Sequence, residues 1–237
     1  GLDWSLQRER YLVELGFYPL GDLHGDNDGR TWDARLAWIP RRAHDKVWHI
    51  GASWSEERLA SRMDGRGQRI SPSVRWQSRP EVGLLATRLI DTGTIDRVQA
   101  IRRAGLEALW IEGPLSIQAE YLHTRVRRHG PPSFTGRGYY VFGSYVLTGE
   151  SRPYRDGQVA NPNARNKQAV ELLLRYSALD LNDGAIAGGR EHNMTAGANW
   201  YPNDHWKLQI NQIFVHAKRR GLRTDDRILA LQVQFHF

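Results

Sequence analysis

Alternation of apolar and polar residues with a period of two is the dominant pattern in this chain, and it is clearest at the C-terminal end. In residues 227–237, alternate positions are apolar, and the positions between them are polar or small. The apolar set is Leu229, Leu231, Val233, Phe235 and Phe237, and the other set is Ala230, Gln232, Gln234 and His236. Because successive side chains of a strand point to opposite faces, this segment is predicted to be a strand with a different environment on each face.

The same alternation recurs upstream, and no segment shows a convincing helical period. The further segments are residues 32–38, 48–54, 115–121, 170–177, 194–200 and 206–211. Tilted strands of about ten residues are long enough to cross the hydrocarbon layer of a membrane. The pattern therefore predicts an all-β chain, and specifically a transmembrane antiparallel β-barrel.

The breaks between these segments are of two kinds. Tight breaks with Pro, Gly or Asn are predicted at Ile39-Pro40, Gly113-Pro114 and residues 201–204. Longer polar loops are predicted at residues 21–30, 57–68, 128–132, 181–190 and 218–226. Short turns at one end and longer loops at the other are typical of outer-membrane barrels, and counting back from a periplasmic C-terminus predicts about twelve strands. Residues 150–167 are then predicted to form an ordered periplasmic excursion.

Composition narrows the class of protein. The chain has 237 residues, a mean hydropathy of -0.59 and no cysteine, so disulfides and thiolate metal sites are excluded. No apolar stretch is long enough for a membrane helix, whereas barrel strands keep average hydropathy low because lipid-facing and lumen-facing residues alternate. The formal charge of +7 is spread over many strands, which argues against nucleic acid as a partner. If the protein is exported, its signal is removed or residues precede Gly1.

Aromatic residues concentrate near the ends of the predicted strands. They are Trp38, Trp110, Tyr121, Trp200, Tyr201 and Trp206. Such residues favour the headgroup level of a membrane. The alternative is a soluble β-sandwich with aromatics in its core, but a sandwich of this length should show shorter strands with turn signals every ~8–12 residues.

Three segments resemble the phosphate-selective porin O and P family of bacterial outer-membrane porins. They are residues 139–154 (YYVFGSYVLTGESRPY), 175–183 (RYSALDLND) and 188–202 (GGREHNMTAGANWYP). Shorter matches lie at residues 79–81, 89–93 and 113–121, and a terminal Phe237 resembles the assembly signal of outer-membrane barrels. The matches keep their order and spacing from about residue 75 to the end.

The resemblance implies a sixteen-stranded trimeric barrel in the bacterial outer membrane that passes phosphate or related anions. This chain is too short for sixteen strands, so either the first strands precede Gly1 or this barrel is smaller. We expect residues 1–237 to form a single barrel domain that lacks the N-terminal strands, with no enzyme activity and no cofactor. The constriction residues of the family cannot be transferred to this chain.

Strand parity predicts which cations face the lumen and form an anion pathway. They are Arg35, Arg75, Arg103, Arg175 and Lys207, and less securely Arg10 and Arg79. Arginine and lysine in a narrow pore lower the electrostatic cost of an anion and raise that of a cation. The alternative is that these cations pair with inward carboxylates and only stiffen the wall. The candidate carboxylates are Glu14, Asp33, Glu107, Glu120 and Glu171, with Glu107 and Glu171 four residues from Arg103 and Arg175.

The remaining sequence features leave other functions open. No histidine spacing predicts a metal site, and no local motif indicates an outer-membrane enzyme. A structural or adhesive barrel with a plugged lumen is a further alternative. The basic clusters at residues 127–129 and 218–220 could attract anions to the pore mouth, bind lipopolysaccharide, or be ordinary solvated loop charge.

Overall fold

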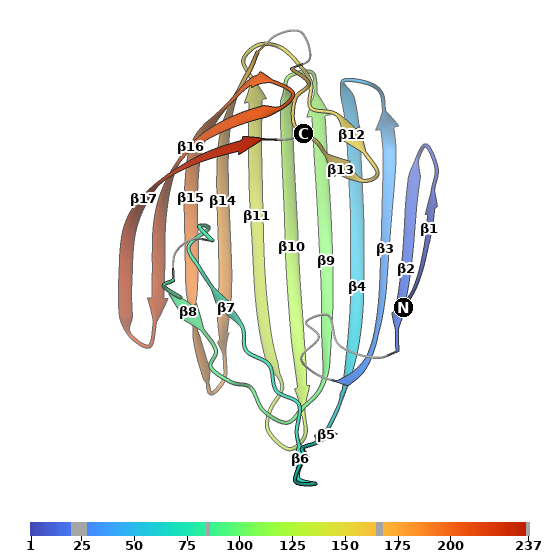
Figure 1. Cartoon of the computed structure of the whole chain (residues 1–237), viewed down its shortest axis with the longest axis vertical. Helices are drawn as coiled ribbons and strands as arrows, with labels where there is room; N and C mark the ends of the chain where they lie inside the picture. The colour runs from blue at the N-terminus through green and yellow to red at the C-terminus, as the bar shows by residue number, and fades with distance from the viewer. Residues whose placement is uncertain (20–27, 84–85, 165–167, 236–237) are drawn as a thin grey trace.

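A computed structural model describes residues 1–19, 28–83, 86–164 and 168–235. Its main feature is one antiparallel sheet of eleven strands in which consecutive long strands are hydrogen-bonded, with the first and the last of them at the two edges (Figure 1). The strands are β1 (Leu2–Gln7), β2 (Tyr11–Tyr18), β3 (Asp28–Arg42), β4 (Lys46–Ala60), β9 (Val98–Glu112), β10 (Leu115–Arg128), β11 (Phe134–Val146), β14 (Ala169–Asp183), β15 (Ile186–Asn203), β16 (Trp206–Arg219) and β17 (Leu222–Phe235). The all-β prediction is confirmed, with eleven long strands in place of about twelve. In the described part of the chain, no helix is long and apolar enough to cross a membrane.

The connections differ from the prediction in several places. Pro40 is not a turn: β3 continues through it, with a register shift between Trp38 and Arg41. Pro202 likewise lies inside β15, at a second irregularity. The predicted long loops at 181–190 and 218–226 are turns of two residues, because the flanking strands extend further than their apolar alternation. The turn between β9 and β10 is tight as predicted, and Gly113 supplies the left-handed φ of 56° that it requires.

In the described part of the chain two longer connections remain, at opposite ends of the sheet. We call the end where residues 147–168 join β11 to β14 the upper end, and the opposite end the lower end (Figure 1). At the lower end, residues 61–97, here called the inward segment, join β4 to β9 and carry the short strands β5 (Arg62–Met63), β6 (Arg69–Ile70), β7 (Gln77–Ser78) and β8 (Ile90–Asp91). At the upper end, β12 (Tyr154–Arg155) and β13 (Gln158–Val159) form a hairpin. The predicted excursion at 150–167 is therefore ordered where it is described.

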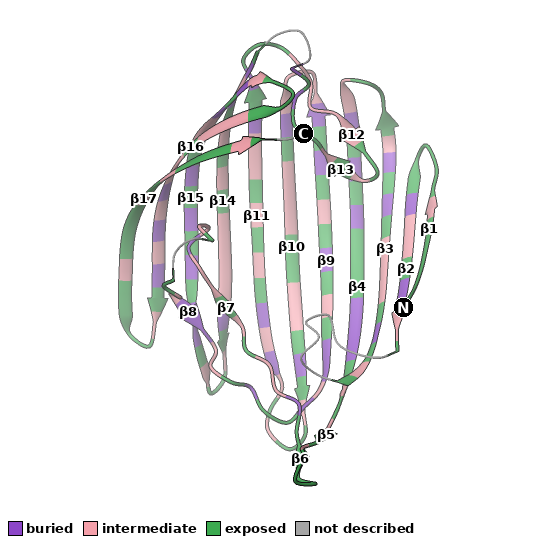
Figure 2. Ribbon diagram, viewed as in Figure 1, coloured by how far each residue is buried: buried purple, intermediate pink, exposed green. Residues whose placement is uncertain are grey.

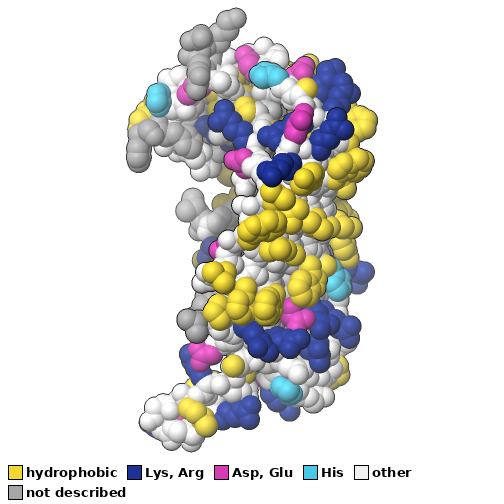
Figure 3. Space-filling view, turned by 90° about the vertical axis from the view of Figure 1, so that its right-hand side faces the viewer, with side chains coloured by type: hydrophobic (Ala, Val, Ile, Leu, Met, Phe, Trp, Pro, Cys, Tyr) yellow, Lys and Arg dark blue, Asp and Glu magenta, His cyan; other side chains and the backbone are white. Residues whose placement is uncertain are grey.

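One face of the sheet is apolar and exposed. Burial alternates along most of the long strands (Figure 2), and hydrophobic side chains form a belt across the middle of the face shown in Figure 3. Trp38 is 58% exposed and Leu231 is 72% exposed. A continuous belt of such exposed apolar side chains is favoured only where it contacts lipid or another protein. Tyr201 is an exception among the predicted belt aromatics, because it faces inward and is 4% exposed. Phe237 and His236 lie outside the described residues.

Both longer connections pack against the other, inner face. Ile90 and Ile95 of the inward segment form a buried cluster with wall residues such as Phe134 and Leu181. The hairpin places Tyr154 and Val159 on a second cluster that includes Ile39 and Ile111. The inner face is therefore covered in part by chain segments that fold back over it.

Candidate pore lining

The inner face of the long strands carries carboxylates at least as often as cations. Register places Asp3, Glu14, Asp33, Glu57, Glu107, Glu120, Glu171, Glu191 and Asp226 on this face. The cations on it include Arg35, Arg103, Arg175 and Lys207, as parity predicted. The wall strands by themselves therefore do not form a surplus of positive charge, and the pairing of each cation decides what it can do.

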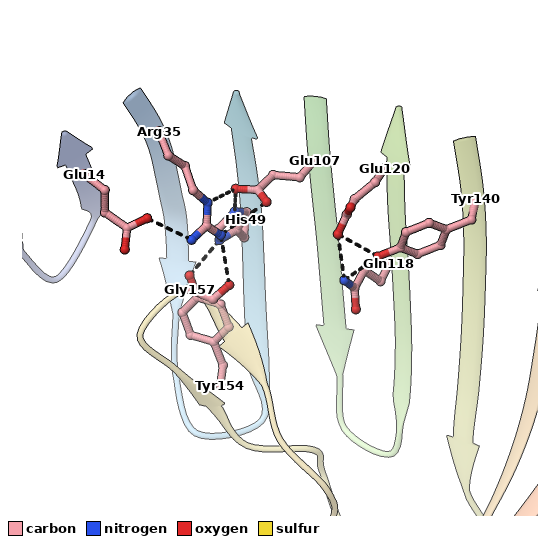
Figure 4. A network of polar contacts seen from close by, with 9 residues as sticks. All are labelled: Glu14, Arg35, His49, Glu107, Gln118, Glu120, Tyr140, Tyr154 and Gly157. Carbon is pink, nitrogen blue, oxygen red and sulfur yellow. Dashed lines mark hydrogen bonds and ion pairs between the residues drawn. The ribbon is translucent and has the colours of Figure 1, made fainter. Parts of the chain in front are cut away.

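Arg35 is held by two carboxylates. Its Nε donates to Glu107 Oε1 at 2.8 Å, and its Nη1 donates to Glu14 Oε2 at 3.1 Å (Figure 4). Neighbouring β2 and β3 bring Glu14 directly opposite Arg35, while Glu107 reaches it from β9. The guanidinium charge is neutralised locally, so Arg35 stiffens the wall, which is the alternative role considered from the sequence.

The same network fixes the hairpin at the upper end. His49 is 3% exposed, and its ring nitrogens lie 2.7 Å from the Tyr154 hydroxyl and 3.1 Å from Glu107 Oε1 (Figure 4). Arg35 Nη2 also donates to the Gly157 carbonyl at 3.4 Å. Arg35, His49, Glu107 and Gly157 line a polar cavity of about 380 Å³ on the inner face, together with Gln118 and Glu120.

Arg103 and Arg175 are also paired, but not with the carboxylates predicted from their own strands. Arg103 forms an ion pair with Glu57 of β4, and its guanidinium lies 5.2 Å from the centre of the Trp76 ring. Arg175 donates to Glu81 Oε1 at 2.8 Å. Both partners come from other parts of the chain, and in each case one side of the cation contacts the inward segment.

Glu81 attaches the inward segment to the wall by several hydrogen bonds. Its Oε1 also accepts from Ser177 Oγ, and its Oε2 accepts from Thr195 Oγ1 at 2.7 Å. The residue has a φ of 55°, a left-handed conformation that non-glycine residues adopt rarely. Contacts with Arg175, Ser177 and Thr195 on β14 and β15 hold it there.

Arg75 does not lie on a wall strand, which corrects the sequence prediction. It belongs to the inward segment, where Val74 forms an isolated bridge with Ile95. Arg75 Nη2 lies 2.5 Å from Asp91 Oδ2, and Arg219 Nη2 of β16 lies 3.3 Å from the same oxygen. The hydrogen bonds from Arg75 hold the pKa of Asp91 well below its usual range. Two guanidiniums thus share one carboxylate.

Among the described residues, no carboxylate forms a hydrogen bond or ion pair with Lys207, Arg79 or Arg10. Lys207 Nζ contacts Asn161 Oδ1 at 3.3 Å and lies 5.4 Å from the centre of the Tyr201 ring. Arg79 donates to the Gly83 carbonyl at 2.9 Å. Arg10 lies in the turn before β2, where its carbonyl accepts from the Ile39 amide.

Sequence reasoning did not assign roles to Glu81 and Asp91, and it considered Arg219 only as part of the basic cluster at residues 218–220. Glu81 and Asp91 lie in the segments 79–81 and 89–93 that resemble the porin family, and that resemblance was the available signal. Among the described residues, no group of three or more His, Asp or Glu side chains is placed to hold a metal ion.

Comparison with known proteins assigns the family. The family described as "Phosphate-selective porin O and P" matches residues 1–237. An uncharacterised protein of Caulobacter vibrioides is 31% identical over 215 residues, which is 85% of this chain and 41% of that protein. Porin O of Pseudomonas aeruginosa is 32% identical over 131 residues, covering 48% of this chain and 29% of Porin O.

The chain thus spans less than half the length of these curated relatives. Its alternating strands and exposed apolar belt are the features that an outer-membrane protein presents to lipid. The chain therefore belongs to the phosphate-selective porin O and P family of bacterial outer-membrane proteins.

Proposed function

We propose that this chain forms part of the wall of a pore for small anions, phosphate among them, and that the inward segment supplies the positive charge that selects them. The whole pore is a single barrel domain that assembles as a homotrimer. In this proposal the wall arginines Arg35, Arg103 and Arg175 mainly hold the structure together. The residues that meet a passing anion are Arg75 of the inward segment and Arg219 at the end of β16.

The observation that carries the proposal is the sharing of Asp91 by two guanidiniums. Arg75 and Arg219 both lie within 3.3 Å of Asp91 Oδ2, so one positive charge at this point is not balanced by Asp91. The side chain of Arg75 is 53% exposed, which leaves its donors accessible to a solvated anion. A guanidinium presents paired donors that match phosphate oxygens.

The composition of the inward segment supports the same assignment. Between residues 61 and 97 it contains Arg62, Arg66, Arg69, Arg75, Arg79, Arg88 and Arg97, against Asp64, Glu81, Asp91 and Asp96. Conduction requires several moderate sites in place of one tight site, because a strongly held ion blocks the channel. A surplus of arginines spread along a segment that folds over the inner face fits that requirement.

Family membership favours a channel over an enzyme, and the printed name of the relative Porin O is that of a porin. A structural or adhesive barrel is the second candidate, because the hairpin and the inward segment both cover parts of the inner face. The two candidates differ in conductance: a plugged barrel passes no current.

The test is the reversal potential of the full-length protein in a planar bilayer across a KCl gradient, followed by addition of phosphate. We expect the reversal potential to lie close to the chloride equilibrium potential, and the chloride current to fall as the phosphate concentration rises. Arg75→Gln and Arg219→Gln should each lower the chloride-to-potassium permeability ratio by about twofold or more.

Arg41→Gln, which removes the same charge from the outer surface, is the matched control and should leave the ratio unchanged. A cation-selective wild-type channel would overturn the anion proposal. A channel that stays silent in every preparation would favour the plugged barrel.

A further inference from the structure

A band of cations follows the outer surface of the sheet at its lower end. Figure 3 shows Lys and Arg side chains both above and below the apolar belt on the face that it presents, and those below it lie at the lower end. By register, the band runs from β3 to β17 on the same face as the exposed apolar residues. We call it the outer basic band; it consists of Arg30, Arg58, Arg102, Arg125, Arg127, Arg137, Arg190, Lys218 and Arg223.

Register places several of these cations directly opposite one another on neighbouring strands. The opposed pairs are Arg30 with Arg58, Arg102 with Arg125, Arg190 with Lys218, and Lys218 with Arg223. Side chains at directly opposite positions have Cβ atoms about 4.5–5.5 Å apart, and like charges there destabilise a sheet. An arrangement repeated across the sheet calls for anions between the pairs.

The carboxylates of the protein do not fully supply them. Glu56 lies 2.5 Å from Arg58 Nε and 2.6 Å from Arg102 Nε, so one carboxylate serves two arginines. Asp180 likewise contacts both Arg190, at 2.9 Å, and Arg137, at 3.6 Å.

Four cations of the band remain without a carboxylate partner among the described residues. They are Arg30, Arg125, Arg127 and Lys218, and all but Arg127 lie directly opposite another cation. The band therefore keeps positive charge that no group of the described chain balances.

The band lies at the boundary between the apolar belt and water. Trp32, which is 44% exposed, shares a register row with Glu56, Arg102 and Arg125. Tryptophan marks the headgroup level of a membrane. The phosphate groups of lipids lie at the same level, so the cations are placed to meet them.

The upper end of the outer face is different. The outward cations of β3 and β4 there are Arg41 and Lys46, which are opposed in register by Trp48 and Glu112. Lys46 forms an ion pair with Glu112 at 2.6 Å. Cations opposed in register are therefore a property of the lower end. They would fit a membrane leaflet whose headgroups are rich in phosphate.

We propose that the outer basic band binds the phosphate groups of lipopolysaccharide, and that the lower end therefore faces the cell exterior. Lipopolysaccharide fits because its lipid part carries phosphates at the headgroup level of a single leaflet, which matches cations that register places opposite one another at the lower end only. Arg102 with Arg125 forms one phosphate site, and Arg190 with Lys218 and Arg223 forms another, each using charge-assisted hydrogen bonds.

The two basic clusters of the sequence divide accordingly. Lys218 and Arg127 belong to the band, whereas Arg219 pairs with Asp91 on the inner side and Arg128 pairs with Asp96. The band lies outside the lumen, so this inference does not depend on the proposed anion pore and can fail or hold independently of it.

The test measures lipid binding to the full-length protein in detergent by native mass spectrometry. The probes are bisphosphorylated lipid A, the same lipid without its phosphates, and phosphatidylglycerol. We expect lipid A to bind, and the affinity to fall about tenfold when its phosphates are removed, because charge-assisted hydrogen bonds are lost. The double variant Arg102→Gln/Arg125→Gln and the single variant Lys218→Gln should each weaken lipid A binding.

The control is Arg8→Gln/Arg41→Gln, which removes the same charge at the upper end and should bind lipid A as the wild type does. Lys218→Gln leaves no carboxylate unpaired, so its effect can be read even if the double variant folds poorly. Equal binding of dephosphorylated lipid A or of phosphatidylglycerol, or an equal loss in the control, would overturn the proposal.

Discussion

Glu81 and Arg175 are separated by 94 residues in the chain, yet Arg175 Nη1 donates a hydrogen bond to Glu81 Oε1 at 2.8 Å. This contact joins the inward segment to the middle of β14. Ser177 and Thr195 add two more hydrogen bonds to the same carboxylate. The position of the inward segment over the inner face is therefore fixed in part by one carboxylate that accepts three hydrogen bonds from the wall.

Replacing Glu81 by Gln should loosen the inward segment without unfolding the sheet. Glutamine keeps the shape but loses the negative charge, and hydrogen bonds to charged groups contribute about 1.5–3 kcal/mol. We expect trypsin to cleave after Arg75 and Arg88 at least about tenfold faster in the variant than in the wild type, because 1.4 kcal/mol is a factor of ten. The measurement is the cleavage rate in detergent at a temperature where the sheet stays folded.

Glu112→Gln is the control for that experiment, since it breaks an ion pair with Lys46 at the upper end and does not touch the inward segment. Equal cleavage rates for Glu81→Gln and the wild type would show that apolar packing around Ile90 holds the segment without help from Glu81.

Replacing Asp91 by Asn should make the pore more selective for anions. The change removes the carboxylate that Arg75 and Arg219 share, so both guanidiniums become available to a passing anion. We expect the chloride-to-potassium permeability ratio to rise by about twofold or more. Asp225→Asn, on the outer surface, is the matched control. A lower or unchanged ratio in Asp91→Asn would place the selective step elsewhere in the pore.

The lowered pKa of Asp91 predicts how this attachment responds to acid. A carboxyl group whose pKa is lower in the folded than in the unfolded protein stabilises the fold at any pH above its unfolded pKa of about 3.9. This stabilisation is lost as the pH falls through the lower pKa of the folded protein. The stability difference between the wild type and Asp91→Asn should be constant from about pH 7 to 5 and shrink below about pH 4. Urea titrations of both proteins across this range provide the measurement, and a difference that already shrinks near pH 6 would contradict the assignment to Asp91.

Gly157→Ala should detach the hairpin of β12 and β13 from the wall. Gly157 has a φ of 77°, and a Cβ there would lie 3.2 Å from Arg35 Nη2 and 3.0 Å from Leu12. The left-handed conformation alone costs a non-glycine residue roughly 1–2 kcal/mol. We expect faster trypsin cleavage after Arg155, whereas Gly143→Ala, which meets open space in β11, should leave that rate unchanged. A rate equal to that of the wild type would mean that His49 and Tyr154 hold the hairpin by themselves.

The outward and inward faces of the long strands could be predicted from the sequence because alternation is a local property. Trp38 and Leu231 are exposed on the outer face as their parity requires, and Arg35 and Arg175 lie on the inner face. Turn positions were less predictable: the strands continue through polar residues beyond the apolar belt, so loops at 181–190 and 218–226 shrink to two-residue turns.

Arg75 shows why the candidate site could be predicted only in part. Val74, Arg75 and Trp76 alternate like a wall strand, but the segment leaves the sheet after β4 and folds over the inner face. The ion-pair partners could not be predicted from the sequence either. Arg175 has Glu171 four residues away on its own strand face, yet it pairs with Glu81, because only the docked inward segment brings that carboxylate near. Such contacts depend on long-range folding that no local pattern records.

A substitution at neighbouring positions of β17 tests the two-faced strand directly. Leu231 faces the apolar outer surface, and Gln232 faces inward. Leu231→Arg should destabilise the folded protein in lipid by about 2–4 kcal/mol if residue 231 lies near the membrane midplane, since a charge there contacts hydrocarbon. Gln232→Arg introduces the same side chain one residue further along and should cost much less, because it projects into a polar environment. Urea titrations in phospholipid vesicles compare the two variants; equal losses would mean that β17 does not separate lipid from water.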